Sequence, residues 1–202
     1  MAGARHVVPA SGGVDPAELF ALGRALGPLS TFAAPTIVRR LVDHAQAQAL
    51  TPADCAAAFK TIVYGGAPMY RADIERALRV MGPRFVQIYG QGETPMVGTV
   101  LSRRHLADHA HPRHGERLAS VGVAQTPVRV RVDAPGGLPG EVLVQGDTVM
   151  AGYWRNPQAS ADALRGGWLH TGDIGTMDEH GFLTLKDRSK DLIISGGSNI
   201  YP

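Results

Sequence analysis

The sequence predicts an α/β fold, in which a mostly parallel sheet with packed helices is followed by a smaller antiparallel, barrel-like β subdomain. Two observations lead to this prediction. In residues 1–100, short apolar runs alternate with segments whose apolar residues recur at helical spacing. After Leu118, apolar and polar residues alternate one by one, and Gly and Pro interrupt these runs, as in PGGLPGE at 135–141.

The first predicted helix begins after Asp15. Asp15 can cap it, Pro16 suits its first turn, and Glu18 lies three residues after the cap. Before this helix, Val7 and Val8 form a short apolar run, which we interpret as a first strand.

Strands and helices are then predicted to alternate as far as Tyr89. Thr51, Pro52 and Asp54 form a helix start with a cap, a first-turn proline and a first-turn carboxylate. Further strands are expected at 31–33, 61–64 and 85–89, and helical periodicity is present over 37–45 and 74–81. Such repetition is typical of a parallel sheet with helices packed on it.

The second subdomain is predicted from alternating runs at 128–132, 142–145 and 183–186. The polar segment 101–118 is the expected boundary. We therefore assign residues 1–110 to the α/β subdomain and residues 111–190 to the β-rich subdomain.

Composition excludes several classes of function. Twenty basic and eighteen acidic residues give a net charge of +2, which is too small to imply nucleic acid or an anionic membrane as a partner. The single cysteine, Cys55, excludes an internal disulfide and fits a reducing compartment. No stretch is apolar enough to span a bilayer, and no signal pattern opens the chain. We expect a soluble, cytoplasmic protein, and the oligomeric state stays open.

Two loops follow predicted strands and carry candidate binding residues. In YGGAP (64–68), small residues let the backbone approach a flat ring, and ligands bind such sheets at the carboxyl ends of the strands. In QIYGQGE (87–93), the Tyr89 ring can stack on a purine, and Glu93 can ligate Mg²⁺ that bridges phosphates. Taken alone, each segment also fits an ordinary turn or exposed loop.

Two further segments complete the pattern. Gly140-Glu141-Val142 through Gly152-Tyr153-Trp154 is interpreted as structural, with no chemistry assigned. In the closing stretch, Gly172 permits a sharp turn, so that Asp173 can present its carboxylate to the two hydroxyls of a ribose. Arg188 follows fifteen residues later, although an Asp–Arg pair alone also fits a surface salt bridge.

In this order, the four segments resemble the signature segments of the AMP-forming adenylating enzymes. That family includes acyl- and aryl-CoA synthetases, luciferases and the adenylation domains of peptide synthetases. The resemblance covers roughly residues 60–202, and SGGSNIYP (195–202) resembles the linker of acid–CoA ligases in particular. It identifies residues 1–110 as part of the large AMP-binding domain, and residues 191–202 as the linker to a lid domain.

The resemblance also implies roles for individual residues. Glu93 is implied to be catalytic as the Mg²⁺ ligand, and Lys190 to be the hinge about which the lid rotates. The GGAP turn and Tyr89 are implied to contact adenine, and Asp173 and Arg188 the ribose. The full implied nucleotide-binding set is Gly66, Ala67, Pro68, Gln87, Tyr89, Gly90, Gly92, Asp173 and Arg188.

One position departs from the family pattern. The family usually has threonine immediately before the glutamate, where its hydroxyl contacts the α-phosphate, and here that residue is Gly92. Backbone N–H groups near Gly92, or the hydroxyl of Thr94, are expected to make that contact instead.

The expected function is that of an acid–CoA ligase fragment. The parent enzyme is expected to use ATP, Mg²⁺ and CoA to activate a carboxylic acid and transfer the acyl group. The 202-residue chain is expected to be inactive by itself, because it has no Ser/Thr/Gly-rich loop ending in lysine and no lysine after Lys190. The alternatives are an adenylating enzyme with a carrier-protein acceptor and a non-catalytic nucleotide-binding module.

Four histidines cluster at residues 105–114 and could suggest a zinc site. No cysteine is near, and nothing in the sequence fixes a tetrahedral geometry, so we interpret this segment as a solvated linker.

Overall fold

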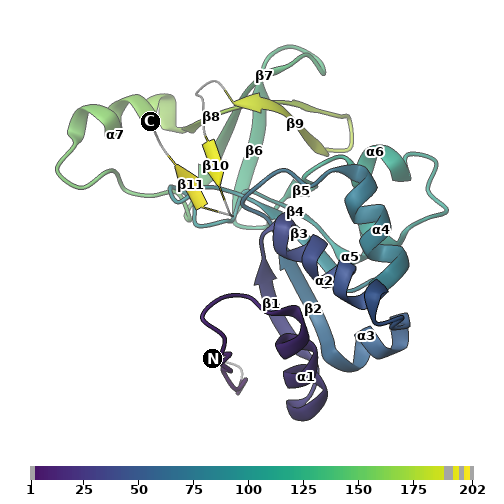
Figure 1. The fold of residues 1–202 in the computed structure, drawn as a ribbon. Coiled ribbons are helices and arrows are strands. Elements are labelled where there is room, and N and C mark those ends of the chain that lie inside the picture. The colour runs from purple at the N-terminus through teal and green to yellow at the C-terminus, as the bar shows by residue number, and fades with distance from the viewer. Residues whose placement is uncertain (1–2, 189–192, 196–197, 201–202) are drawn as a thin grey trace.

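Two sheets form the frame of the molecule (Figure 1). The computed structural model describes residues 3–188, 193–195 and 198–200. The first sheet has five strands in the order β1-β2-β3-β4-β5, and the second has four in the order β6-β7-β8-β9. Two short strands near the carboxyl end, β10 (Ile193–Ser195) and β11 (Ser198–Ile200), pair antiparallel.

The first sheet is parallel in one half and antiparallel in the other. Its parallel strands are β1 (Leu29–Ala33), β2 (Phe59–Tyr64) and β3 (Phe85–Tyr89). Strands β4 (Thr99–Leu101) and β5 (Val123–Ala124) extend it antiparallel. Since β2 and β3 run in the same direction, the loops that follow Tyr64 and Tyr89 leave from the same edge of the sheet.

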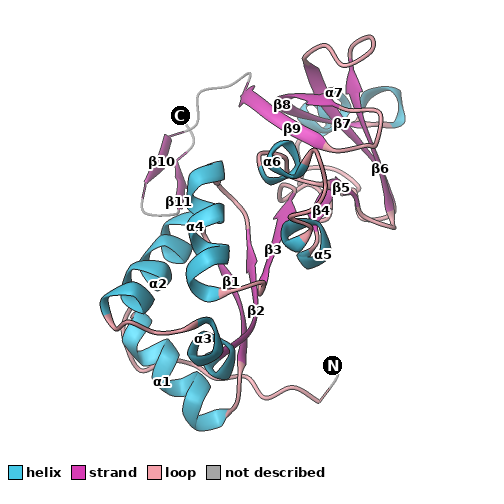
Figure 2. Cartoon of the chain, turned by 90° about the vertical axis from the view of Figure 1, so that its right-hand side faces the viewer, coloured by secondary structure: helices cyan, strands magenta, loops and turns pink. Residues whose placement is uncertain are grey.

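Four helices lie on one side of the three parallel strands (Figure 2). They are α1 (Pro16–Leu26), α2 (Pro35–Ala47), α3 (Pro52–Ala58) and α4 (Arg71–Met81). The expected caps form: the side chain of Asp15 accepts from the backbone of α1, and Thr51 and Asp54 make a capping box on α3. Phe20 and Phe59, both fully buried, meet edge to face at 4.9 Å in the core below the sheet.

The second sheet is curled and antiparallel, a half-barrel. Its strands are β6 (Val128–Asp133), β7 (Gly140–Gly146), β8 (Leu169–Met177) and β9 (Leu183–Arg188). Helix α7 (Pro157–Ala163) and the 3-10 turn η1 (Arg165–Gly167) lie in the connection from β7 to β8. Together the two sheets confirm the predicted α/β fold class with its antiparallel second part.

Two local predictions were wrong. Val7 and Val8 form no strand, and Val8 is 90% exposed, because this two-residue run has no neighbouring strand to pair with. The histidine segment 105–114 is not a solvated linker. It runs from within α5 (Arg103–Ala107) to the start of α6 (His114–Leu118), and each helix is anchored in the core by one buried leucine, Leu106 and Leu118.

The change from the first sheet to the second lies later than the predicted boundary at residue 110. Strand β5 still belongs to the first sheet and ends at Ala124, and β6 opens the second sheet at Val128. The assignment of these parts as domains stays a prediction. Among the described residues, no helix is long and apolar enough to cross a membrane.

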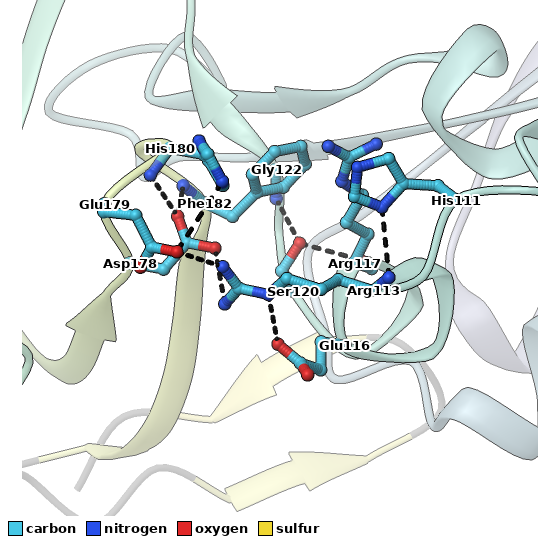
Figure 3. A network of polar contacts seen from close by, with 10 residues as sticks. All are labelled: His111, Arg113, Glu116, Arg117, Ser120, Gly122, Asp178, Glu179, His180 and Phe182. Carbon is cyan, nitrogen blue, oxygen red and sulfur yellow. Dashed lines mark hydrogen bonds and ion pairs between the residues drawn. The ribbon is translucent and has the colours of Figure 1, made fainter.

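The junction between the sheets is held by an arginine at the start of α6 (Figure 3). The guanidinium of Arg113 contacts Glu116 Oε2 at 2.7 Å, Asp178 Oδ2 at 3.1 Å and Glu179 Oε1 at 2.6 Å. Asp178 and Glu179 lie in the turn between β8 and β9, so Arg113 fixes this turn to α6. Beside it, the Arg117 guanidinium lies 4.8 Å from the centre of the Phe182 ring.

Backbone hydrogen bonds strengthen the same junction. Val121 N donates to Leu183 O at 2.8 Å, and Leu183 N donates to Gly122 O at 2.9 Å. The β8–β9 hairpin is therefore anchored both by its backbone and by its turn. This anchoring determines where the hairpin's side chains lie relative to the first sheet.

Candidate nucleotide site

The candidate site is built around Asp173 on β8 and Tyr89 at the end of β3. Tyr89 Oη donates to Asp173 Oδ2 at 2.7 Å, and Gln91 Nε2 donates to the same oxygen at 2.9 Å. Gln91 Nε2 also donates to Thr171 O at 2.8 Å. Asp173 is only 3% exposed and Tyr89 8% exposed. Residues 84 positions apart in the sequence thus form one buried polar cluster that links the two sheets.

Asp173 reaches this position because β8 is bulged. Glu141 pairs with Ile174 and Leu143 with His170, so Val142 alone lies opposite three residues of β8, 171–173. Gly172, at the centre, has a φ of +70°, a region that favours glycine. The predicted turn at Gly172 is therefore a bulge inside a strand.

Side chains on both strands hold the bulge in place. Thr171 Oγ1 donates to Val142 O at 2.7 Å and accepts from Asp173 N at 3.1 Å. Glu141 Oε1 accepts from Gly172 N at 3.0 Å, while Glu141 Oε2 lies 2.8 Å from His170 Nδ1. Burial by itself would raise the pKa of Glu141, but the contacts with His170, Gly172 N–H and Arg165 outweigh it and lower that pKa.

The structure aligns Arg188 with Asp173. The two residues are backbone partners in the β8–β9 pair. The side chain of Arg188 and the whole of Lys190 lie outside the described residues, so the predicted ribose contact of Arg188 and the hinge role of Lys190 stay predictions.

The GGAP turn lies at the same sheet edge as Tyr89. Gly66 and Pro68 are exposed and Ala67 is half-buried, so this turn is accessible. Gly65 is required by close packing, because a Cβ there would lie 2.4 Å from Ile88 O on β3. Gln87 differs from Gly66, Ala67 and Pro68 of the turn, because it is 6% exposed and its Oε1 accepts from Tyr64 Oη at 3.1 Å. Its side chain thus lies in the core below the turn.

The loop after Tyr89 is tightly folded around Gly90. A Cβ on Gly90 would lie 2.6 Å from Met96 Cα, so only glycine lets the loop close. Gly92 is different, because it is exposed, has no positive φ, and a Cβ there would have no atom within 4 Å. Thr94 is 1% exposed, and its Oγ1 lies 3.2 Å from Thr148 Oγ1. The Thr94 hydroxyl is thus buried beside Thr148, and its expected contact with the α-phosphate, like the alternative contact from backbone N–H groups near Gly92, stays a prediction.

Glu93 is a half-buried carboxylate on this loop. Its Oε1 accepts from Tyr153 Oη at 2.6 Å, and its backbone O accepts from Met150 N at 2.8 Å. Within the described part of the chain, no group of three or more His, Cys, Asp or Glu side chains could hold a metal. A single half-buried carboxylate such as that of Glu93 fits Mg²⁺, because this ion takes only one or two protein oxygens and completes its coordination shell with phosphates and water.

Histidines of the segment 105–114 pack against other groups. The His109 and His114 ring centres are 4.7 Å apart, and His114 Nε2 lies 3.1 Å from Leu106 O. The His105 ring meets the Phe182 ring at 5.2 Å.

Known proteins with related sequences are adenylate-forming enzymes. A family model described as "AMP-binding enzyme" matches residues 1–154. Feruloyl-CoA synthase of an Amycolatopsis species is 39% identical over 177 residues, which are 85% of this chain and 33% of that protein. A medium/long-chain-fatty-acid–CoA ligase of Mycobacterium tuberculosis is 33% identical over 194 residues, 93% of this chain and 32% of that protein. The chain spans about a third of the length of these relatives.

Solved structures agree with the sequence comparison. The amide bond synthetase McbA of Marinactinospora thermotolerans superposes with a TM-score of 0.78 at 35% identity, covering 93% of this chain and 37% of that one. A double mutant of the o-succinylbenzoate CoA synthetase of Bacillus subtilis gives 0.77 at 29% identity, covering 94% and 36%.

Proposed function

Since this chain belongs to the AMP-binding enzyme family, we propose that it is the nucleotide-binding part of an acid–CoA ligase. The complete protein activates a carboxylic acid with ATP to an acyl-adenylate, releases pyrophosphate, and transfers the acyl group to CoA. The observation that carries this proposal is the buried Asp173–Tyr89–Gln91 cluster, at the sheet edge where the GGAP turn also lies. The CoA ligases among its relatives support CoA as the acceptor.

In this proposal, Asp173 binds the ribose. A carboxylate accepts hydrogen bonds from both ribose hydroxyls, and hydrogen bonds to a charged acceptor are stronger than neutral ones. Tyr89 and Gln91 donate to Asp173 Oδ2 and so hold the carboxylate in a fixed orientation before the nucleotide arrives. The open GGAP turn accepts the flat face of the base, because its small residues let the backbone approach closely.

Glu93 acts at the phosphates. When bound, Mg²⁺ neutralises charge on the phosphate oxygens and orients them for attack by the substrate carboxylate. Glu93 supplies an oxygen ligand to the ion, and the exposed backbone beside Gly92 offers N–H donors to the α-phosphate. The protein thereby contributes positioning and charge stabilisation.

The acid and the acceptor define the alternatives. One relative is a fatty acid–acyl-carrier-protein ligase of Streptomyces coeruleorubidus, 37% identical over 146 residues, 69% of this chain and 27% of that protein. This similarity favours a carrier-protein acceptor as the second candidate. A non-catalytic nucleotide-binding module is the third. A cytoplasmic location and the absence of a nucleic-acid partner stay predictions.

The test is ATP–pyrophosphate exchange by the complete protein with aromatic and fatty acids, followed by thioester formation with CoA or with a phosphopantetheinylated carrier protein. Exchange that depends on an acid, together with transfer to CoA, supports the proposal. Transfer to the carrier protein alone favours the second candidate. Nucleotide binding without exchange for any acid contradicts the catalytic proposal.

The 202-residue chain by itself is proposed to be inactive, because its sequence has no Ser/Thr/Gly-rich loop ending in lysine to hold the triphosphate. Oriented charge on the triphosphate supplies most of the rate in this chemistry. The purified chain is expected to give no exchange above an Asp173→Ala control. Exchange above that control would contradict this part of the proposal.

A further inference from the structure

Tyr153 contacts Glu93 from a segment to which the sequence assigned no chemistry. Tyr153 Oη donates to Glu93 Oε1 at 2.6 Å, across 60 positions of the sequence. Glu93 Oε2 accepts no hydrogen bond from the described residues. One oxygen of this carboxylate is thus held by a phenol, and the other is left for a further partner.

Two more contacts join the same segment to the Glu93 loop. Met150 N donates to Glu93 O at 2.8 Å, and Thr148 Oγ1 lies 3.2 Å from Thr94 Oγ1. Thr148 and Met150, which follow β7, therefore contact two successive residues of the loop, one through side chains and one through the backbone. These contacts fix the backbone of Glu93. The hydrogen bond from the Tyr153 phenol then determines the orientation of the Glu93 side chain.

The Tyr153 backbone is itself fixed by α7. Tyr153 N donates to Ser160 Oγ at 2.8 Å, and Ser160 Oγ donates to Asn156 O at 2.7 Å. Asn156 caps α7, since its Oδ1 accepts from Ala159 N at 3.1 Å. Gly152 suits this approach, because a Cβ there would lie 3.0 Å from Ser160 Oγ and its φ of +151° is one that other residues rarely adopt. Tyr153 is therefore held in place before any ligand binds.

We propose that Tyr153 is a positioning residue that orients the Glu93 carboxylate for a divalent cation. The inference rests on the proposed function, in which Glu93 is the magnesium ligand. Carboxylates that bind metals are commonly hydrogen-bonded by a neighbouring group, which fixes their orientation and affects metal affinity. The phenol donates one proton in a hydrogen bond to Oε1 and takes no part in the reaction.

The test measures metal binding and kinetics in the complete protein. Mn²⁺ replaces Mg²⁺, and the loss of the free Mn²⁺ electron paramagnetic resonance signal reports binding in the presence of a non-hydrolysable ATP analogue. Tyr153→Phe keeps the ring and removes the hydroxyl. It is expected to weaken Mn²⁺ binding by about tenfold, which is the lower end of the loss seen when a hydrogen-bond partner of a metal ligand is removed. In steady-state assays it is expected to raise the Mg²⁺ concentration needed for half-maximal rate, with kcat recovered at high Mg²⁺.

Two further variants complete the design, together with a control. Tyr70→Phe, at a tyrosine that is 69% exposed, is the matched control and is expected to change neither readout. In the double variant Glu93→Gln/Tyr153→Phe, the tyrosine substitution is expected to add nothing to the effect of Glu93→Gln. Ser160→Ala, which frees the Tyr153 backbone, is expected to weaken Mn²⁺ binding in the same direction but less.

The outcomes separate this inference from the proposed function. If Glu93→Gln weakens Mn²⁺ binding but Tyr153→Phe leaves it unchanged, the positioning role is wrong and the role of Glu93 stands. An equal loss from Tyr153→Phe with and without Glu93→Gln also overturns it, because the tyrosine then acts independently of the carboxylate. Unchanged binding in Glu93→Gln overturns both the inference and the metal role of Glu93.

Discussion

Replacing Asp173 with asparagine in the complete protein tests the ribose-binding role directly. Asparagine keeps the shape of the side chain and an oxygen that can still accept from Tyr89 and Gln91, so the fold around this buried position is expected to survive. The negative charge is lost. The substitution therefore reports on the charged acceptor rather than on packing.

The expected magnitude follows from two ribose hydroxyls. A hydrogen bond to a charged acceptor contributes about 1.5–3 kcal/mol, and a neutral one about 0.5–1.5 kcal/mol. The difference is about 1–1.5 kcal/mol per bond, or about 2–3 kcal/mol for both. At tenfold per about 1.4 kcal/mol, the apparent KM for ATP is expected to rise about 30- to 150-fold.

The assay is ATP–pyrophosphate exchange titrated with ATP at saturating acid, with nucleotide affinity measured separately by calorimetry. Asp133→Asn is the matched control, because Asp133 lies on β6 of the same sheet with a side chain that is 58% exposed. It is expected to leave the KM for ATP unchanged. A KM within about threefold of wild type in Asp173→Asn, with native thermal unfolding, would refute the reasoning and remove Asp173 from the ribose site.

Three other predictions concern a loop, a helix contact and pH. Gly92→Thr is expected to change kcat/KM for adenylation by less than about tenfold, because the backbone there has no positive φ and the space is open; a gain of several orders of magnitude would indicate a catalytically impaired loop. Gly23→Ala is expected to lower the free energy of unfolding by about 1–3 kcal/mol in chemical denaturation, because its Cβ would lie 2.1 Å from Ala58 O at the end of α3. Gly12→Ala is the near-neutral control, because a Cβ there would have no atom within 4 Å. The folded pKa of Glu141 lies below its ordinary value of 4.5, so its stabilisation is complete above pH 4.5 and is lost as pH falls through the lower folded value. The wild-type unfolding free energy is therefore expected to fall more steeply below pH 4.5 than that of Glu141→Gln, and equal slopes would contradict this.

Much of the first sheet and its helices could be predicted because their signals are local. Asp15 and Thr51 cap their helices through neighbouring backbone groups, and both caps form as expected. Strand β8 was not predicted. Its sequence LHTGDIGTM contains two glycines, and the bulge opposite Val142 breaks the alternation of apolar and polar residues. Only pairing with β7 and β9 makes this segment a strand.

The site was predictable as a set of residues but not as an arrangement. The resemblance pointed to Tyr89 and Asp173 separately, whereas the hydrogen bond between them depends on how the two sheets meet. Gln91, Glu141 and Tyr153 were missed as supporting residues. The Gly-Glu and Gly-Tyr pairs of residues 140–153 were a visible signal, but their partners lie 31 and 60 positions away in the sequence, and no periodicity reports such contacts.

Because Tyr89 belongs to the first sheet and Asp173 to the second, the candidate site exists only while the two sheets keep their relative position. The β8–β9 hairpin that carries Asp173 is fixed at its turn by Arg113 and along β9 by the backbone pair at Leu183. Both anchors belong to the segment between β4 and β6, which includes the residues 105–114 that were interpreted as a linker. Helix α6 therefore does more than connect two subdomains. From the opposite end of the hairpin, it helps to position Asp173, the carboxylate proposed to bind the ribose, so sequence changes there are expected to alter nucleotide binding without touching the nucleotide.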